Sequence, residues 1–292
     1  MLAALGIGTK KDALQLLCSR LSGLTKDPRG WQEVMLLVLR LVPEDTALAG
    51  LKDRRVLEML LSLCEANLLP YPSLDDGTQH LLQATKRLLA TRPLYAHLSR
   101  FPLAFFAAAA TLLLRAATQD EDAWVAASRA NTDDSDAIKP ATAWSLLVEL
   151  VGVLLAAVQL PVVDNAAASS EDARLEAAGR SHVEAAGLLA TTFEVLAAGT
   201  AASKAANDAI RALADEAVGR ALNVLHALLV ARPEHTDYRV VVTVLGHAVD
   251  HHHTLFTLCR HHDDATRSMA CAVLQAVLLE AVRLAPAPHQ CN

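Results

Sequence analysis

The sequence predicts an all-α protein, and three observations lead to this fold class. Alanine and leucine, which have strong helix propensity, are abundant. Aromatic residues, which strands favour, make up only 4% of the chain. Prolines fall at the ends of long periodic segments and not inside them, as expected of helix boundaries. We therefore expect roughly ten to twelve helices, joined by short turns into antiparallel hairpins.

In the N-terminal part of the chain, proline marks a boundary of each expected helix. The first has Asp27 as its cap and Pro28 in its first turn. The expected helices cover about 28–42, 53–68, a segment ending at Arg92 and a segment beginning at Pro102. Residues 118–139 are acidic and polar, which predicts a partly disordered insert or a module boundary.

The C-terminal part begins with a helix at Pro140, and residues 161–170 are expected to form a loop. The best amphipathic helix follows, with Arg211, Asp215 and Arg220 on its polar side. Its apolar stripe consists of Ile210, Leu213, Ala214, Ala217, Val218, Ala221, Val224, Leu225, Leu228 and Leu229. Residues 238–245 are rich in β-branched side chains, but their apolar positions have helical spacing, which predicts a helix.

The last expected helix covers about residues 265–284 and is apolar nearly all round. Such a helix is expected to pack between neighbours. We expect the whole chain, residues 1–292, to form one helical-repeat domain. Whether residues 1–117 and 140–292 are separate modules stays open at this point.

Charge and cysteine content indicate which binding partners and which cellular compartment to expect. The net charge is -6, the pI is about 6.0 and there is no basic stripe, so we expect no nucleic-acid partner. The five cysteines include no CxxC pair, which is typical of free thiols in a reducing compartment. The N-terminal stretch "MLAALGIGTKK" has no basic region before its short apolar run and is a poor signal peptide. These features predict an intracellular protein, cytoplasmic or nuclear.

One segment has the length of a membrane span, "ATAWSLLVELVGVLLAAVQL", residues 141–160. Glu149 lies near its centre, where a charge costs ~2.5–3.5 kcal/mol on insertion scales. A buried helix in a large helical protein accounts for this stretch and for similar shorter ones. We therefore expect no membrane span.

The segment "LFTLCRHHDDATRSMACAVLQAVLLEAV", residues 255–282, resembles the inter-helix turn and second helix of an armadillo or HEAT repeat. The matching positions are Asp263 or Asp264, Arg267, Ala270, Leu274 and Leu278. The resemblance implies an α-solenoid whose surface binds other proteins, and it implies no catalytic residues.

Six of the 12 histidines lie between His247 and His262, in "GHAVDHHHTLFTLCRHH". His247, Asp250 and His251 share a helix face and have ligand chemistry suited to zinc or iron. His262 and Asp263 resemble the His–Asp pair of HD-type metal-dependent phosphohydrolases. The alternative is structural: His251 to His253 lie at the end of one helix, and His261 and His262 at the end of the next, where unpaired carbonyls favour them. Asp263 or Asp264 then caps the following helix.

The structural interpretation accounts for both histidine groups without a ligand, so we assign no catalytic, cofactor-binding or metal-binding residue from the sequence. The expected function is a non-enzymatic scaffold or adaptor that binds other proteins, with no cofactor and no small-molecule substrate. The alternative is a helical, HD-like metal-dependent hydrolase that uses the C-terminal His/Asp cluster.

Overall fold

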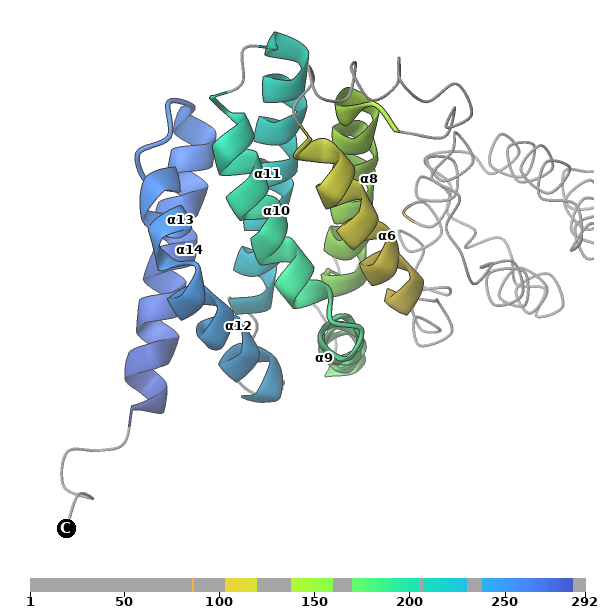
Figure 1. The fold of residues 1–292 in the computed structure, drawn as a ribbon. Coiled ribbons are helices and arrows are strands. Elements are labelled where there is room, and N and C mark those ends of the chain that lie inside the picture. The colour runs from red at the N-terminus through yellow and green to blue at the C-terminus, as the bar shows by residue number, and fades with distance from the viewer. Residues whose placement is uncertain are drawn as a thin grey trace, which may run out of the picture.

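A computed structural model describes residues 103–119, 138–159, 170–204, 207–229 and 238–285, together with Lys86. These residues form eight helices and no strand, which confirms the all-α prediction for the described part (Figure 1). The helices are α6 (Leu103–Ala117), α8 (Pro140–Val158), α9 (Ser170–Ala185), α10 (Leu188–Ala202), α11 (Asp208–Leu229), α12 (Tyr238–Asp250), α13 (His252–Leu258) and α14 (Asp264–Leu284). The helices expected before residue 93, most of the acidic segment 118–139 and nearly all of the loop 161–170 lie outside these residues.

The described helices are arranged in two layers (Figure 1). One layer contains α8, α11 and α14, with α11 in contact with both of the others. The other contains α6, α10 and the α12–α13 pair, with α10 in contact with each neighbour. Across the layers, α6 packs on α8, α10 on α11, and α13 on α14. α9 lies across one end and packs on α8 and α12.

The two longest central helices form most of the core. α8 begins at Pro140, as predicted, and 13 of its 19 residues are buried. In α11 the predicted apolar stripe is buried except for the half-buried Leu213, which confirms the amphipathic assignment. Arg220 on the polar side of α11 donates a 3.0 Å hydrogen bond to the carbonyl oxygen of Val148 on α8. This bond and the apolar contacts join the two helices.

The segment with many β-branched residues is helical, as its spacing predicted. α12 buries Val240, Val241, Val244 and Ala248 along one face. Its opposite side exposes Tyr238, Val242 and Val249. The periodicity of the apolar positions therefore outweighs the strand preference of the individual residues.

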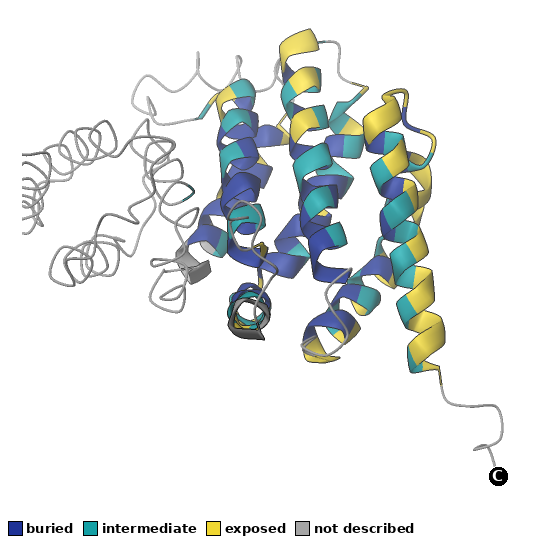
Figure 2. Ribbon diagram, turned by 180° about the vertical axis from the view of Figure 1, so that it is seen from behind, coloured by how far each residue is buried: buried dark blue, intermediate teal, exposed yellow. Residues whose placement is uncertain are grey.

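The last helix corrects a prediction. α14 was expected to pack between neighbours, but only Thr266, Ala270 and Val273 are buried along it. Leu278, Leu279 and Val282 are 58%, 62% and 75% exposed. Figure 2 shows the exposed surface running down the C-terminal half of the helix. α11, α12 and α13 cover only one side of α14, so its apolar outer side has no neighbour among the described residues.

The expectation of no membrane span is also corrected. Two helices of the described part, α8 and α14, are long and apolar enough to cross a membrane, and the bent pair α9–α10 would make a third if it counts as one span. The two helices differ in their surroundings. The apolar 18-residue stretch of α8 is 67% buried, whereas that of α14 is only 22% buried. In α8, Glu149 forms a 2.6 Å ion pair with Lys86.

Candidate functional site

The first two histidines of the C-terminal His/Asp group lie around the junction of α12 and α13. His247 belongs to α12, and His251 occupies the single position between the helices. The rings of both pack near Phe193 of α10, with centroid separations of 5.6 Å for His247 and 5.5 Å for His251. These two rings therefore take part in the packing of α12 and α13 on α10.

The next two histidines begin a helix, although the sequence placed all of His251 to His253 at the end of one. His252 and His253 are the first residues of α13. The ring Nδ1 of His252 lies 2.7 Å from the carbonyl oxygen of Val249. A histidine that bonds the last carbonyls of the preceding helix is the structural role that the sequence predicted.

The two aspartates begin α14 as predicted. The carboxylate of Asp263 accepts a 2.8 Å hydrogen bond from the backbone N–H of Thr266, which makes Asp263 the N-cap. This bond, together with the nearby His261 and His262, holds the pKa of the Asp263 carboxyl below its usual value. Arg267 then donates a 3.1 Å bond to the carbonyl oxygen of His261, which closes the turn.

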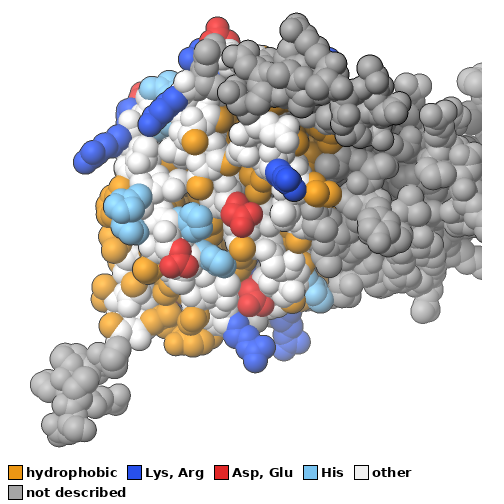
Figure 3. All heavy atoms as spheres, in the orientation of Figure 1, with side chains coloured by type: hydrophobic (Ala, Val, Ile, Leu, Met, Phe, Trp, Pro, Cys, Tyr) orange, Lys and Arg blue, Asp and Glu red, His pale blue; other side chains and the backbone are white. Residues whose placement is uncertain are grey.

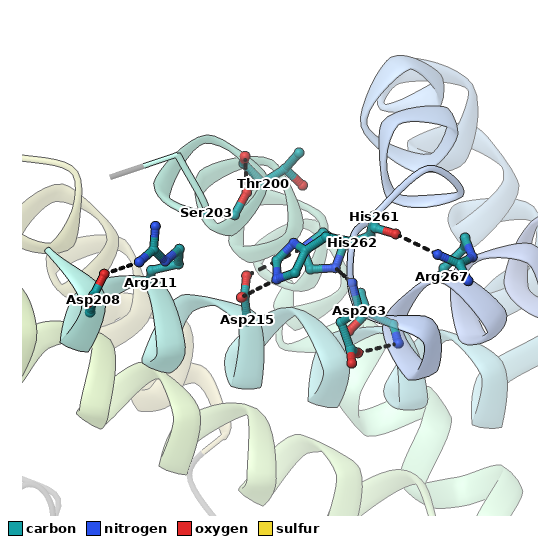
Figure 4. A network of polar contacts seen from close by, with 10 residues as sticks. Thr200, Ser203, Asp208, Arg211, Asp215, His261, His262, Asp263 and Arg267 are labelled. Carbon is teal, nitrogen blue, oxygen red and sulfur yellow. Dashed lines mark hydrogen bonds and ion pairs between the residues drawn. The ribbon is translucent and has the colours of Figure 1, made fainter. Parts of the chain in front are cut away.

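Within the described residues, one group of three potential metal ligands lies within 4.8 Å of one another: Asp215, His261 and His262. Asp215 comes from α11 and the histidines from the turn before α14 (Figure 4). Nε2 of His261 lies 3.4 Å from Oδ1 of Asp215, and Nε2 of His262 lies 3.7 Å from Oδ2. We call this group the Asp215–His261–His262 cluster.

The members of the cluster differ in exposure. The side chain of His261 is 7% exposed, that of Asp215 is 22% exposed and that of His262 is 68% exposed. Oδ1 of Asp215 is buried and has no hydrogen-bond partner within the described part, despite its 3.4 Å distance from His261. The cluster therefore has a buried inner side, formed by His261, and an open outer side, formed by His262.

The hydrogen bond at the second ring nitrogen of His261 fixes the tautomer of the neutral imidazole. Nδ1 of His261 accepts a 3.2 Å bond from the backbone N–H of Asp263. A neutral imidazole that accepts at Nδ1 carries its proton on Nε2, which faces Asp215. A metal on Nε2 would require the proton on Nδ1 and the loss of this long hydrogen bond, at a net cost of about 0.5–1.5 kcal/mol.

Of the sequence candidates, only His262 belongs to this cluster. His247, Asp250 and His251 do not form a ligand group by the same distance test, and Asp263 serves as the helix cap. The sequence placed Asp215 on the polar side of its helix but did not connect it with the histidines. No short-range signal could have done so, because packing of α11 against α14 brings these residues together.

Comparison with protein-family models finds no match to this chain, and comparison with curated proteins finds none either. The chemistry of the site is therefore inferred from its own residues. Two imidazole nitrogens and a carboxylate oxygen are ligands that suit zinc and other late first-row divalent ions.

Proposed function

We propose that this chain is a non-enzymatic, intracellular scaffold or adaptor, built as an armadillo- or HEAT-like α-solenoid, that binds a partner protein through the outer side of α14. The observation that carries the proposal is the apolar outer side of α14. Leu278, Leu279 and Val282 are each more than half exposed there.

The helix arrangement supports the solenoid. Three successive units, α6 with α8, α10 with α11, and α12–α13 with α14, each place one member in each layer (Figure 1). Each unit packs on the next, as stacked helical repeats do. Terminal repeats of such proteins need a polar outer side to stay soluble alone. α14 is the last described helix of its layer and presents apolar residues instead.

The partner surface that fits α14 best is an amphipathic helix. Exposed positions of α14 recur at three- and four-residue steps, through Ser268, Cys271, Gln275, Leu278 and Val282. Such a row is the ridge that packs against another helix at about 8–10 Å between axes. Small and polar residues come first along the row and large apolar residues follow. Figure 3 shows hydrophobic side chains gathered at the lower left of the described part, where Figure 1 places α12 and the C-terminal half of α14.

The test uses a double variant, Leu278→Asp with Val282→Asp, which places two charges on the outer side of α14. The matched control is Leu112→Asp on α6, a residue that is 43% exposed. Affinity capture from native extract is followed by reconstitution of the complex with the purified partner. The wild type and the control should bind that partner, and the double variant should lose at least tenfold in affinity, as expected at an apolar contact centre.

Two results would overturn the proposal. One is a reconstituted complex whose affinity is unchanged by the α14 double variant. The other is flotation of the wild-type chain with liposomes that the double variant abolishes, because the outer side of α14 would then contact lipid and not protein. Far-UV circular dichroism of each variant ensures that the comparison is made between folded proteins.

A further inference from the structure

We propose that Asp215, His261 and His262 form a binding site for a divalent transition metal, with zinc as the preferred ion. The site is independent of the partner surface on α14, and nothing in the proposed scaffold function requires it. It joins α11 to the turn between α13 and α14 (Figure 4).

The spacing of the ligand atoms fits a tetrahedral ion. Zinc binds imidazole nitrogen and carboxylate oxygen at about 2.0–2.2 Å, which places two ligand atoms of a tetrahedron roughly 3.3–3.6 Å apart. The two nitrogen–oxygen separations in the cluster are 3.4 Å, from His261 to Oδ1 of Asp215, and 3.7 Å, from His262 to Oδ2. One ligand atom from each of the three side chains lies within 4.8 Å of the others, so a turn of the Asp215 carboxylate and small shifts of the two imidazoles would place them around one ion.

A second observation is the buried oxygen of Asp215. Oδ1 is removed from solvent and has no hydrogen-bond partner among the described residues. Buried carboxylate oxygens are costly unless a partner or a cation satisfies them. A zinc ion between Asp215 and His261 would do this, and the exposed His262 leaves the outer side open to water as a fourth ligand.

The electrostatic surroundings also favour a cation. Asp263 directly follows His262 in the chain, and Asp264 comes next as the first residue of α14. With two neutral imidazoles and the Asp215 carboxylate as ligands, a zinc site would keep one net positive charge. The two neighbouring carboxylates then offset that charge.

Zinc binding has a local consequence that can be observed. With the ion on Nε2, the proton of His261 lies on Nδ1 and faces the N–H of Asp263, so the 3.2 Å bond between them is broken. The amide of Asp263 should therefore change its environment on zinc binding. Amides around His252 and His253, a second adjacent pair with ring centroids 3.9 Å apart, should not.

The experiment uses the full chain, purified without a metal-affinity tag and stripped with chelator. Zinc chloride is titrated by calorimetry at neutral pH, and cobalt absorption bands report the coordination number. The test variants are Asp215→Asn, which keeps the side-chain shape, and His262→Ala at an exposed position. The control is the double variant His252→Ala with His253→Ala, which removes an adjacent pair that belongs to no three-ligand group in the described part.

We expect one zinc per wild-type chain, tetrahedral cobalt bands and a shifted Asp263 amide. Each test variant should weaken zinc binding about tenfold or more, and the control should stay within about twofold of the wild type. Absence of stoichiometric binding by the wild type would overturn the proposal. So would wild-type affinity in Asp215→Asn, or a loss in the His252/His253 control equal to that in His262→Ala.

Discussion

Gly199 of α10 lies directly against Val218 of α11. A Cβ atom built on Gly199 would lie 2.4 Å from Cγ2 of Val218 and 3.3 Å from the carbonyl oxygen of Ala214. Real Cβ contacts do not become this short, so the two helices approach each other at a distance that only glycine permits. α10 and α11 are the central pair of the two layers (Figure 1).

Gly199→Ala should lower the free energy of unfolding by about 1–3 kcal/mol, because the added methyl group overpacks this contact. The matched control is Gly219→Ala on α11, where a Cβ would meet no atom within 4 Å. That change should stabilise the helix by about 0.5–1 kcal/mol. Chemical denaturation measures both. Equal effects of the two substitutions would contradict the packing argument.

The contact also predicts an energetic coupling. In a Val218→Ala background the branched side chain is gone, so Gly199→Ala should cost about 0.5–3 kcal/mol less than in the wild type. A double-mutant cycle on the four proteins gives this coupling directly. Strict additivity would show that the helices are not in the close contact described.

The cap of α14 predicts a difference between two neighbouring aspartates. Asp263→Ala removes the acceptor for the Thr266 N–H and should lower the Tm by about 2–4 °C, whereas Asp263→Asn keeps an acceptor and most of the stability. Asp264→Ala removes only an exposed ion pair with Arg267 and should change little. Thermal unfolding measures the Tm of each variant. A larger decrease in Tm for Asp264→Ala than for Asp263→Ala would contradict the role of Asp263 as the N-cap.

Features that depend on local sequence were predictable. The start of α8 at Pro140 and the cap at Asp263 each follow from a few adjacent residues. The stripe of α11 and the helical state of α12 follow from periodicity over a dozen or more residues. In each case the physical cause lies within one helix, so the local sequence pattern is enough to predict the feature.

Features that depend on distant packing were not predictable. The partnership of Asp215 with His261 and His262 arises only when α11 packs against α14. Similarly, the apolar composition of α14 indicated burial on all sides, but whether a neighbour covers a helix is a property of the fold and not of that segment. Glu149 is a third case, because its partner Lys86 is distant in the sequence.

The Lys86–Glu149 pair gives a prediction about charge within an apolar helix. Glu149 is 16% exposed and Lys86 is 34% exposed, and their side-chain atoms lie 2.6 Å apart. Glu149→Gln should lower the free energy of unfolding by about 1.5–3 kcal/mol, because the lysine loses a charged acceptor. The double change Lys86→Met with Glu149→Leu should restore most of the lost free energy of unfolding, since no charge is then left unpaired.

The measurement is urea denaturation of the wild type, Glu149→Gln and the double variant. A double variant that is no more stable than Glu149→Gln would contradict the pairing. Retention of full stability in Glu149→Gln would show that the ion pair contributes nothing to folding.

The thiol of Cys259 predicts a reactivity that depends on pH. Its pKa is raised to about 11, mainly by burial and further by the side chain of Cys271, with which it forms a hydrogen bond. Because the thiolate is the reactive form, Cys259 should react slowly with iodoacetamide at pH 8, and its rate should rise about tenfold for each unit by which the pH increases toward that pKa. Cys271 is exposed and should be modified first.

Peptide mass mapping separates the two sites, and Cys271→Ala should speed modification of Cys259. Equal rates for both cysteines in the wild type at pH 8 would refute the prediction.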